Sequence, residues 1–487
     1  MLKRDCSCSP FLVSLSIIAK TFIILQTRIM KQTNFMKKIT LLACTLLIAI
    51  SAWADELPVN HIELTDAERQ LVKSNNVFAF NLFRKARGDK NSIMSPLSIT
   101  YALGMLNNGA AGQTQQEICD VLGFGDAGAD GINQFCRKLL TKAPTLDQET
   151  TAEIANTIYV NKSTGYELQQ GFIDKANEFY DAKPEALEFF DEERTVEIIN
   201  DWGNEHTHGM IPKVLDINMF DRNVASILLN AIYFKGVWAY QFEKANTREE
   251  AFNGGSAVPM MSQMAKFEYT EGDLFQTVCL PYGNGAFEMT IFLPREGKTI
   301  DDVLAVVKDW NKDPTEKVYR EIYEVDLKMP RIKTDTDINL VPIMQDLGMP
   351  TAFTIAAEFP YFGNRDVYIS KMFQKAVIEL DEEGTKAAAI TVIDMTESEP
   401  LPVSFHADRP FFYIITERST GIIFFIGQYL GESTNGISPV DNGNWTRDNE
   451  AGVAFDLSGR QIANRKTSNS KLKRGLYIIN GKKVVVN

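Results

Sequence analysis

The sequence predicts an α+β fold in which helices pack around a large, mostly antiparallel β-sheet. Apolar residues at helical spacing dominate the first part of the chain, whereas short apolar or aromatic runs, separated by Gly and Pro, dominate after about residue 225. Helices first and strands later are typical of α+β proteins, whereas a regular alternation of strands and helices would indicate a parallel sheet. The composition is that of a soluble globular protein, with 45% apolar and 23% charged residues among 487.

The helical part begins with residues 68–86, whose apolar side chains recur near helical spacing. Ser95-Pro96 is typical of a helix start, because Ser can cap the first turn and Pro fits within it. Residues 114–122 and 132–140 predict two further short helices. The strand candidates are short apolar or aromatic runs: residues 227–229, 231–234, 287–293 and 411–415.

Residues 1–54 are predicted to be a leader. A basic segment begins at Met36, the apolar run 39–50 follows, and Ala52-Trp53-Ala54 has the small residues of a signal cleavage site. The apolar run is too short to span a bilayer comfortably. We therefore expect translation to start at Met36 and cleavage after Ala54, which makes the mature protein secreted or surface-exposed, with no membrane span in its body.

Two alternatives concern this leader. Residues 41–44 end in Cys44 and could be a lipoprotein cleavage box, but they come early in the apolar run, most of which lies beyond them. Residues 11–25 form a second apolar stretch, which is either an uncleaved anchor or part of an extension upstream of Met36. We favour the extension.

The charge distribution separates a body, residues 55–432, from a tail, residues 437–487. The net charge of the chain is −13, which argues against a general nucleic-acid binder. From Ser433 onward, the chain contains nine basic and four acidic residues. Residues 453–460 and 474–486 predict strands joined by Gly turns, so we expect a small β domain. The tail resembles the C-terminal sorting tails of proteins exported by the Bacteroidetes type IX system; the alternative is a β appendage that packs on the body.

Motifs for catalysis or cofactor binding are unconvincing, so we expect no enzyme, cofactor or metal. Neither a Gly-x-Ser-x-Gly elbow nor a His-Glu-x-x-His zinc motif is present. His206 and His208 follow a helical pattern without a third ligand, which favours a surface pair. Gly123–Gly128 matches a dinucleotide fingerprint but closes a helix, whereas that motif must open one. Arg87-Gly88-Asp89 is better explained as a turn, and the three cysteines after the leader predict no disulfide framework.

The segment 382–400 has a pattern suited to two environments. Alternate residues point to opposite faces of a strand. One set begins with the small residues Thr385, Ala387 and Ala389 and carries no charge, whereas both charges, Lys386 and Asp394, fall in the other set. Such a segment can enter a sheet as a strand, yet remain soluble outside it. The alternative is a surface loop or a short Ala-rich helix.

Five motifs in order resemble the serpin family, covering about residues 60–432. The segment Glu382-Glu383-Gly384-Thr385-Lys386-Ala387-Ala388-Ala389 is similar to the serpin reactive-centre hinge. The other four are residues 91–114, similar to the early helices; 199–211, similar to the element that crosses the main sheet; 230–238, similar to a strand that meets the opening sheet; and 407–427, similar to the closing hairpin.

This resemblance implies a serpin fold with an exposed reactive-centre loop and suicide inhibition of proteases. A protease would cut the loop, form an acyl-enzyme, and be carried along as the loop inserts into the central sheet. Glu382 and Glu383 would anchor the loop and Gly384 would let it turn. Ser95, Ser98, Asn230 and Trp238 would control sheet opening together with Gln374, which replaces the usual His. The resemblance implies that Gln374 can still donate and accept hydrogen bonds with Ser95, Ser98 and Asn230, with an altered pH dependence.

In serpins, fourteen residues separate the hinge glycine from the cut, and this spacing, counted from Gly384, places the reactive bond at Ser398-Glu399. Met395, Thr396 and Glu397 remain alternatives if the register differs by a few residues. A small residue before the bond suits elastase- or subtilisin-like serine proteases, and cysteine proteases stay open because they also form acyl-enzymes. The intact small residues of the hinge favour an inhibitor over the alternative, a non-inhibitory serpin that acts as a surface binding protein. We expect a monomer.

Overall fold

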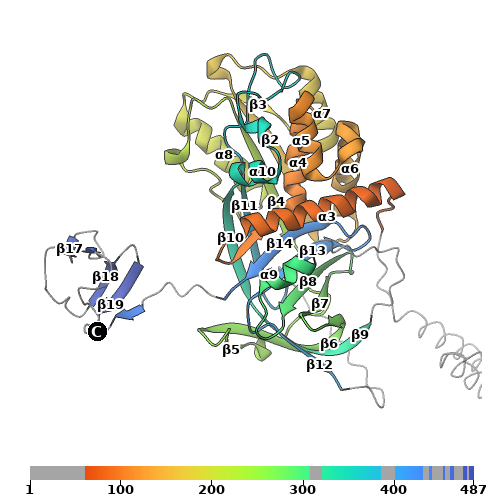
Figure 1. Cartoon of the computed structure of the whole chain (residues 1–487), viewed down its shortest axis with the longest axis vertical. Helices are drawn as coiled ribbons and strands as arrows, with labels where there is room; N and C mark the ends of the chain where they lie inside the picture. The colour runs from red at the N-terminus through yellow and green to blue at the C-terminus, as the bar shows by residue number, and fades with distance from the viewer. Residues whose placement is uncertain are drawn as a thin grey trace, which may run out of the picture. The chain divides into compact units, whose positions relative to one another are not determined.

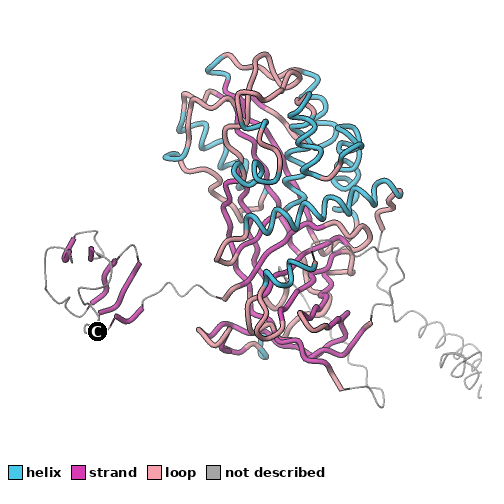
Figure 2. The backbone as a smooth tube through the Cα atoms, in the orientation of Figure 1, coloured by secondary structure: helices cyan, strands magenta, loops and turns pink. Residues whose placement is uncertain are grey.

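The computed structural model describes residues 61–307, 321–384 and 401–431, together with five short strands between residues 438 and 486. The predicted leader and most of the predicted reactive loop therefore lie outside the described residues. Within them, helices and strands gather in different regions of the body (Figures 1 and 2), as an α+β fold requires. The described helices include none long and apolar enough to cross a membrane.

The helices begin where the sequence offers capping residues. Thr65 and Glu68 form a capping box at the start of α3, and Ser95 caps α4 by accepting a hydrogen bond from the Ser98 backbone N–H, with Pro96 in the first turn. The α-helices of the described residues are α3 (Asp66–Ala86), α4 (Pro96–Asn107), α5 (Gly112–Leu122), α6 (Gly128–Lys142), α7 (Gln170–Tyr180), α8 (Glu192–His206), α9 (Ile300–Val306) and α10 (Val341–Leu347). The helices predicted at 68–86, 114–122 and 132–140 are thereby confirmed.

The largest sheet has nine strands in the order β1-β14-β13-β8-β7-β6-β9-β12, with β5 paired to β6. Its strands are β1 (Ser92–Met94), β5 (Arg248–Ala251), β6 (Ala257–Glu271), β7 (Phe275–Tyr282), β8 (Phe287–Pro294), β9 (Ile322–Pro330), β12 (Val403–His406), β13 (Phe411–Glu417) and β14 (Ile423–Tyr429). All pairs are antiparallel except β12 with β9. Every residue of β8, β13 and β14 is buried, so the core lies along these strands.

Two smaller sheets lie beside each other. One contains β3 (Glu185–Leu187), β2 (Thr151–Asn161) and β4 (Ser226–Lys235), and the other contains β10 (Ile332–Asn339) and β11 (Phe373–Leu380). Strands β4 and β11 are neighbours, but among the described strands no hydrogen-bonded ladder joins them. We call this boundary the β4–β11 seam. Strands β1 to β3 precede residue 225, so the expected division into helices first and strands later was incomplete.

The two strands at the seam run in the same direction. Near one end, Asn230 of β4 and Gln374 of β11 both bond to Ser98. At the other end, Val237 and Gly384, which follow β4 and β11, form an isolated β-bridge. A segment that leaves Gly384 and turns back between these strands would therefore be antiparallel to both.

Helix α8 and the chain after it cover the β3-β2-β4 sheet and reach across the β4–β11 seam. A separate apolar cluster joins Val196 and Ile199 of α8 to Ile227 and Leu229 of β4. On the other side, Lys375 Nζ of β11 donates to the Lys213 backbone oxygen at 2.9 Å. Strands β4 and β11 can therefore separate only if this covering segment moves.

The tail forms its own five-stranded sheet in the order β15-β19-β18-β16-β17. Its strands are β15 (Ser438–Val440), β16 (Val453–Phe455), β17 (Gln461–Asn464), β18 (Gly475–Ile479) and β19 (Lys482–Val486). Strands β16, β18 and β19 lie in the two segments where the sequence predicts strands.

Candidate functional site

Eight of the predicted site residues lie in the described part of the chain, and they fall into two groups at opposite ends of the seam. Glu382, Glu383, Gly384 and Trp238 form the loop base, and Ser95, Ser98, Asn230 and Gln374 form a polar network that we call the shutter network. Outside the described residues lie Thr385, Lys386, Ala387, Ala388, Ala389, Met395, Thr396, Glu397, Ser398 and Glu399.

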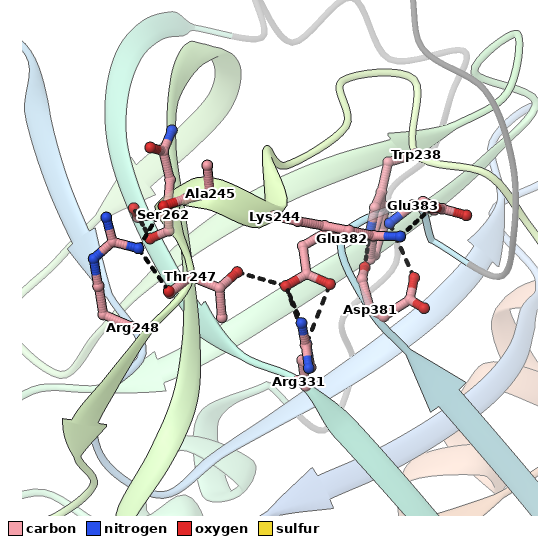
Figure 3. A network of polar contacts seen from close by, with 11 residues as sticks. Trp238, Lys244, Ala245, Thr247, Arg248, Ser262, Arg331, Asp381, Glu382 and Glu383 are labelled. Carbon is pink, nitrogen blue, oxygen red and sulfur yellow. Dashed lines mark hydrogen bonds and ion pairs between the residues drawn. The ribbon is translucent and has the colours of Figure 1, made fainter.

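The loop base is anchored by the buried carboxylate of Glu382, whose side chain is 1% exposed. Arg331 donates to both of its oxygens, through Nε at 3.0 and 3.1 Å and through Nη2 at 2.6 Å (Figure 3). Thr247 Oγ1 donates to the same carboxylate at 2.5 Å. Burial alone would raise the pKa of Glu382, but these hydrogen bonds lower it below its ordinary value. The carboxylate therefore stays charged and holds the end of β11 in place.

Main-chain hydrogen bonds fasten the loop base to the segment after β4. The backbone N–H groups of Trp238 and Phe242 donate to the carbonyl oxygens of Glu383 and Glu382, at 3.2 and 2.9 Å. The Trp238 indole Nε1 donates to the Asp381 carbonyl at 2.9 Å, and its ring stacks on Tyr282 with centroids 4.4 Å apart. The aromatic packing fixes the indole, and the indole in turn fixes the last residues before the loop.

Gly384 occupies a position that other residues cannot take without strain. Its φ is +94°, in the region that favours glycine. A Cβ there would come within 2.5 Å of the Gly236 carbonyl oxygen and 2.6 Å of the Trp238 backbone nitrogen. Glycine is therefore required both for the turn and for the close approach of two backbones.

The shutter network connects both strands of the seam to the start of α4. Gln374 is 1% exposed, and its Nε2 donates to the Ser95 carbonyl at 2.9 Å and to Ser98 Oγ at 2.8 Å, while its Oε1 accepts from the Ser95 N–H at 3.0 Å. Ser98 Oγ donates to Asn230 Oδ1 at 2.5 Å. Since Ser98 contacts both strands, separating them breaks at least one of these bonds.

The sequence correctly indicated that Gln374 bonds to Ser95 and Ser98, but its expected bond to Asn230 is indirect and passes through Ser98. Three further participants were missed, namely Arg331, Thr247 and Asn156. Each reaches the site through the fold rather than through a neighbouring motif: Asn156 Oδ1, for example, accepts from Asn230 Nδ2 at 2.7 Å across the β2–β4 pair. Local sequence carries no signal for such partners.

The Gln374→Leu variant is expected to lose about 3 kcal/mol of unfolding free energy, because it leaves several buried polar groups of the shutter network without partners. The midpoint of urea unfolding, followed by circular dichroism, measures this loss. Gln345→Leu, at an exposed position of α10, is the matched control and should change stability by less than about 0.5 kcal/mol. Equal midpoints for the two variants would show that the network contributes little to holding the seam.

The motifs set aside at the sequence level have structural explanations. Gly123 caps α5 with a φ of +76°, so the glycine-rich segment follows a helix, as expected. His206 stacks on Trp202, whereas His208 Nε2 lies 2.9 Å from Glu153 Oε2. Within the described ranges, no cluster of three or more His, Cys, Asp or Glu side chains is arranged to hold a metal ion.

Comparisons with known proteins agree on one family. The model of the family described as Serpin (serine protease inhibitor) matches residues 73–431. Serpin B6 of Pongo abelii is 33% identical over 376 residues, covering 74% of this chain and 98% of that protein, and neuroserpin of Gallus gallus is 30% identical over 375 residues, covering 73% and 89%.

Solved structures give the same result. The thermophilic serpin tengpin in its native state has a TM-score of 0.67 and 27% identity, covering 77% of this chain and 96% of that one. Arabidopsis AtSerpin1 in its native stressed conformation has a TM-score of 0.66 and 25% identity, covering 76% and 99%. With the family model matching well over half of its residues, the chain belongs to the serpin family.

Proposed function

We propose that this protein is an exported protease inhibitor that traps its target as a covalent complex and inserts its cleaved loop at the β4–β11 seam. The observation that carries the proposal is the seam itself, where no ladder among the described strands joins two neighbouring parallel strands, and where Gly384 forms a β-bridge with Val237 beyond their ends. A returning strand would be antiparallel to both, a common and stable pairing. Membership of a family of protease inhibitors supports it.

The trapping chemistry uses the protease's own first step. The protease's serine or cysteine attacks the carbonyl carbon of Ser398, an ester or thioester bond forms, and the Ser398–Glu399 peptide bond breaks with a proton passing to the released Glu399 amine. Residues 385–398 then enter the seam as a strand. Fourteen residues at roughly 3.3 Å each span about 46 Å, so the protease is carried along the sheet and distorted before water can cleave the acyl bond.

The target class follows from the residue before the reactive bond. Ser398 is small, so shallow-pocketed elastase- or subtilisin-like serine proteases are the proposed targets, with cysteine proteases as a second class. The alternatives Met395, Thr396 and Glu397 would place other side chains in the protease pocket. Peptide mapping of the cleaved protein identifies the bond.

The second candidate is a non-inhibitory serpin that acts as a binding protein. Thyroxine-binding globulin, solved as a complex with thyroxine, is 26% identical with a TM-score of 0.65, so a binding protein has this fold as well. The small residues Thr385, Ala387 and Ala389 argue against this candidate, because they suit insertion of the loop into a sheet.

The test is incubation of the purified protein with elastase- and subtilisin-type proteases, followed by a denaturing gel. A band at the summed mass of inhibitor and protease is expected, and it should be absent when the protease serine has been blocked beforehand. Cleavage without that band across a broad panel of serine and cysteine proteases would favour the binding-protein candidate.

Export is part of the proposal. The signal segment ending at Ala54 supports secretion, and the basic β tail supports a sorting role of the type IX kind. Intact-mass analysis of the protein from the culture medium and the cell surface should find Asp55 at the amino terminus. The same masses report whether residues 437–487 have been removed.

A further inference from the structure

An exposed apolar surface lies on the loop that follows β3 and the loop that precedes β4. Phe190 is 57% exposed, Ile217 41% and Met219 64%, and we call these three side chains the end patch. Single exposed apolar residues are ordinary on a protein surface, whereas a group of them on neighbouring loops is typical of a contact site. The trapping steps described above give this patch no role.

The two loops of the end patch are fastened to each other and to the sheet. The ring centroids of Phe189 and Phe220 are 5.5 Å apart, edge to face. The Arg222 guanidinium carbon lies 5.7 Å from the centroid of the Phe190 ring. Asn161, at the end of β2, is fully buried and donates through Nδ2 to the Arg222 carbonyl at 2.8 Å. The patch is therefore held in one shape, and such a surface loses little entropy when it binds a partner.

The end patch lies at the end of the seam opposite to Gly384. Strand β2 is antiparallel to β4 and parallel to β3, so the ends of β2 and β3 and the start of β4 lie together. Phe190 follows β3 by three residues, and Met219 precedes β4 by seven. On the β11 side, Lys371 Nζ donates to the Met219 carbonyl at 2.8 Å. Figure 1 shows β3 at the upper end of the body, whereas β9 and β12 lie at the lower end.

The length of the loop determines where a trapped protease would stop. In the proposed insertion, each residue after Gly384 lies one position closer to the starts of β4 and β11. Ser398 is the fourteenth residue after Gly384. Counted back by the same number, the β11 side reaches Ser370, and the β4 side, counted from Val237, reaches Asn223. This count brings the acyl bond beside the end patch.

We propose that the end patch is the surface on which the trapped protease docks, and that this contact shields the acyl bond from water. The inference rests on the proposed function, because the protease reaches the patch only through insertion of the loop. Apolar atoms make up roughly half or more of an ordinary protein surface, so a protease can offer the patch an apolar area to cover. Hydrolysis would restore the protease's serine and leave a carboxylate on Ser398, and the docked protease slows this step by covering the bond.

The lifetime of the covalent complex tests this inference. The complex of the full chain with an elastase-type serine protease is separated from free protease, and the return of protease activity is followed over days. Because the contact forms only after insertion, Phe190→Ser with Met219→Ser should shorten the lifetime about tenfold and leave the rate of complex formation within about twofold of the parent. Circular dichroism checks that the variant is folded.

Val306→Ser with Ile322→Ser is the matched control. These side chains are about as exposed, at 60% and 64%, but they belong to α9 and β9 rather than to the loops of the end patch. This double variant should leave the lifetime of the complex unchanged. Equal lifetimes for the two double variants would overturn the inference while leaving inhibition intact.

Hydrogen exchange locates the contact directly. Amides of residues 188–191 and 216–222 should exchange at least about fivefold more slowly in the covalent complex than in cleaved inhibitor from which the protease has been released by hydrolysis. Both samples contain the inserted loop, so the difference reports the protease alone. Equal exchange in the two samples would overturn the inference. Absence of any covalent complex with the parent protein would instead overturn the proposed function, and this inference with it.

Discussion

The Ala387→Arg variant is expected to be cleaved by the target protease at a normal rate and to form almost no covalent complex, a loss of at least about a hundredfold in trapping. Ala387 belongs to the uncharged set of the hinge, so its side chain would face the interior when the loop enters the seam. A buried, unpaired guanidinium costs several kcal/mol, which delays insertion. Water then has time to hydrolyse the acyl bond.

Ala388→Arg is the matched control, because it is the same substitution one residue further along. Since neighbouring residues of a strand point to opposite faces, its Arg would stay on the solvent side with Lys386. The ratio of covalent complex to cleaved inhibitor on a denaturing gel distinguishes the two variants. Equal trapping by both would contradict insertion in the proposed register, and trapping by Ala387→Arg alone would indicate a register shifted by one residue.

The second large effect is expected at the loop base, where Arg331→Met should lower the unfolding free energy by about 3 kcal/mol. The substitution leaves the buried Glu382 carboxylate with the Thr247 hydroxyl but without its guanidinium partner. Lys333→Met is the control, because Lys333 of β10 pairs with Glu379 of β11 at an exposed position, with side chains 78% and 56% exposed. That pair should contribute less than about 1 kcal/mol.

The effect of Arg331 should depend on pH in a defined direction. The folded-state pKa of Glu382 lies below its ordinary value of 4.5, so the stabilisation is complete above about pH 4.5 and is lost as the pH falls through the folded-state pKa. The difference in urea midpoint between the parent and Arg331→Met should therefore shrink on acidification. A difference that stays constant down to pH 3 would mean that the carboxylate charge is not what Arg331 stabilises.

Features with local causes were predictable from the sequence. Ser95-Pro96 starts a helix because the cap and the fixed φ of proline act within one turn, and the structure confirms this start. The small residues of the hinge are likewise visible in the alternation of the chain alone. The resemblance to serpins placed Gln374 beside Ser95 and Ser98, which the structure also confirms.

Features that depend on long-range contacts were not predictable. Arg331 reaches Glu382 because β10 and β11 pair, over a separation of 51 residues. Asn156 meets Asn230 through the pairing of β2 and β4, and β2 itself was not predicted as a strand. The register of the paired strands determines which side chains become neighbours in this way, and that register is set only when the whole sheet has formed.

The unpaired edges of β4 and β11 have a further consequence at high protein concentration. Once the covering segment after α8 has moved aside, an unpaired strand edge can accept any extended segment of suitable shape, and nothing in the geometry of the described residues requires donor and acceptor to be the same molecule. A loop from a second molecule would make a head-to-tail contact, and such contacts form open chains when the rotation between copies does not close a ring. The tethered loop has the advantage of an effective concentration in the millimolar range. If the seam receives a strand as proposed, linear self-association on concentration or mild warming is the expected hazard.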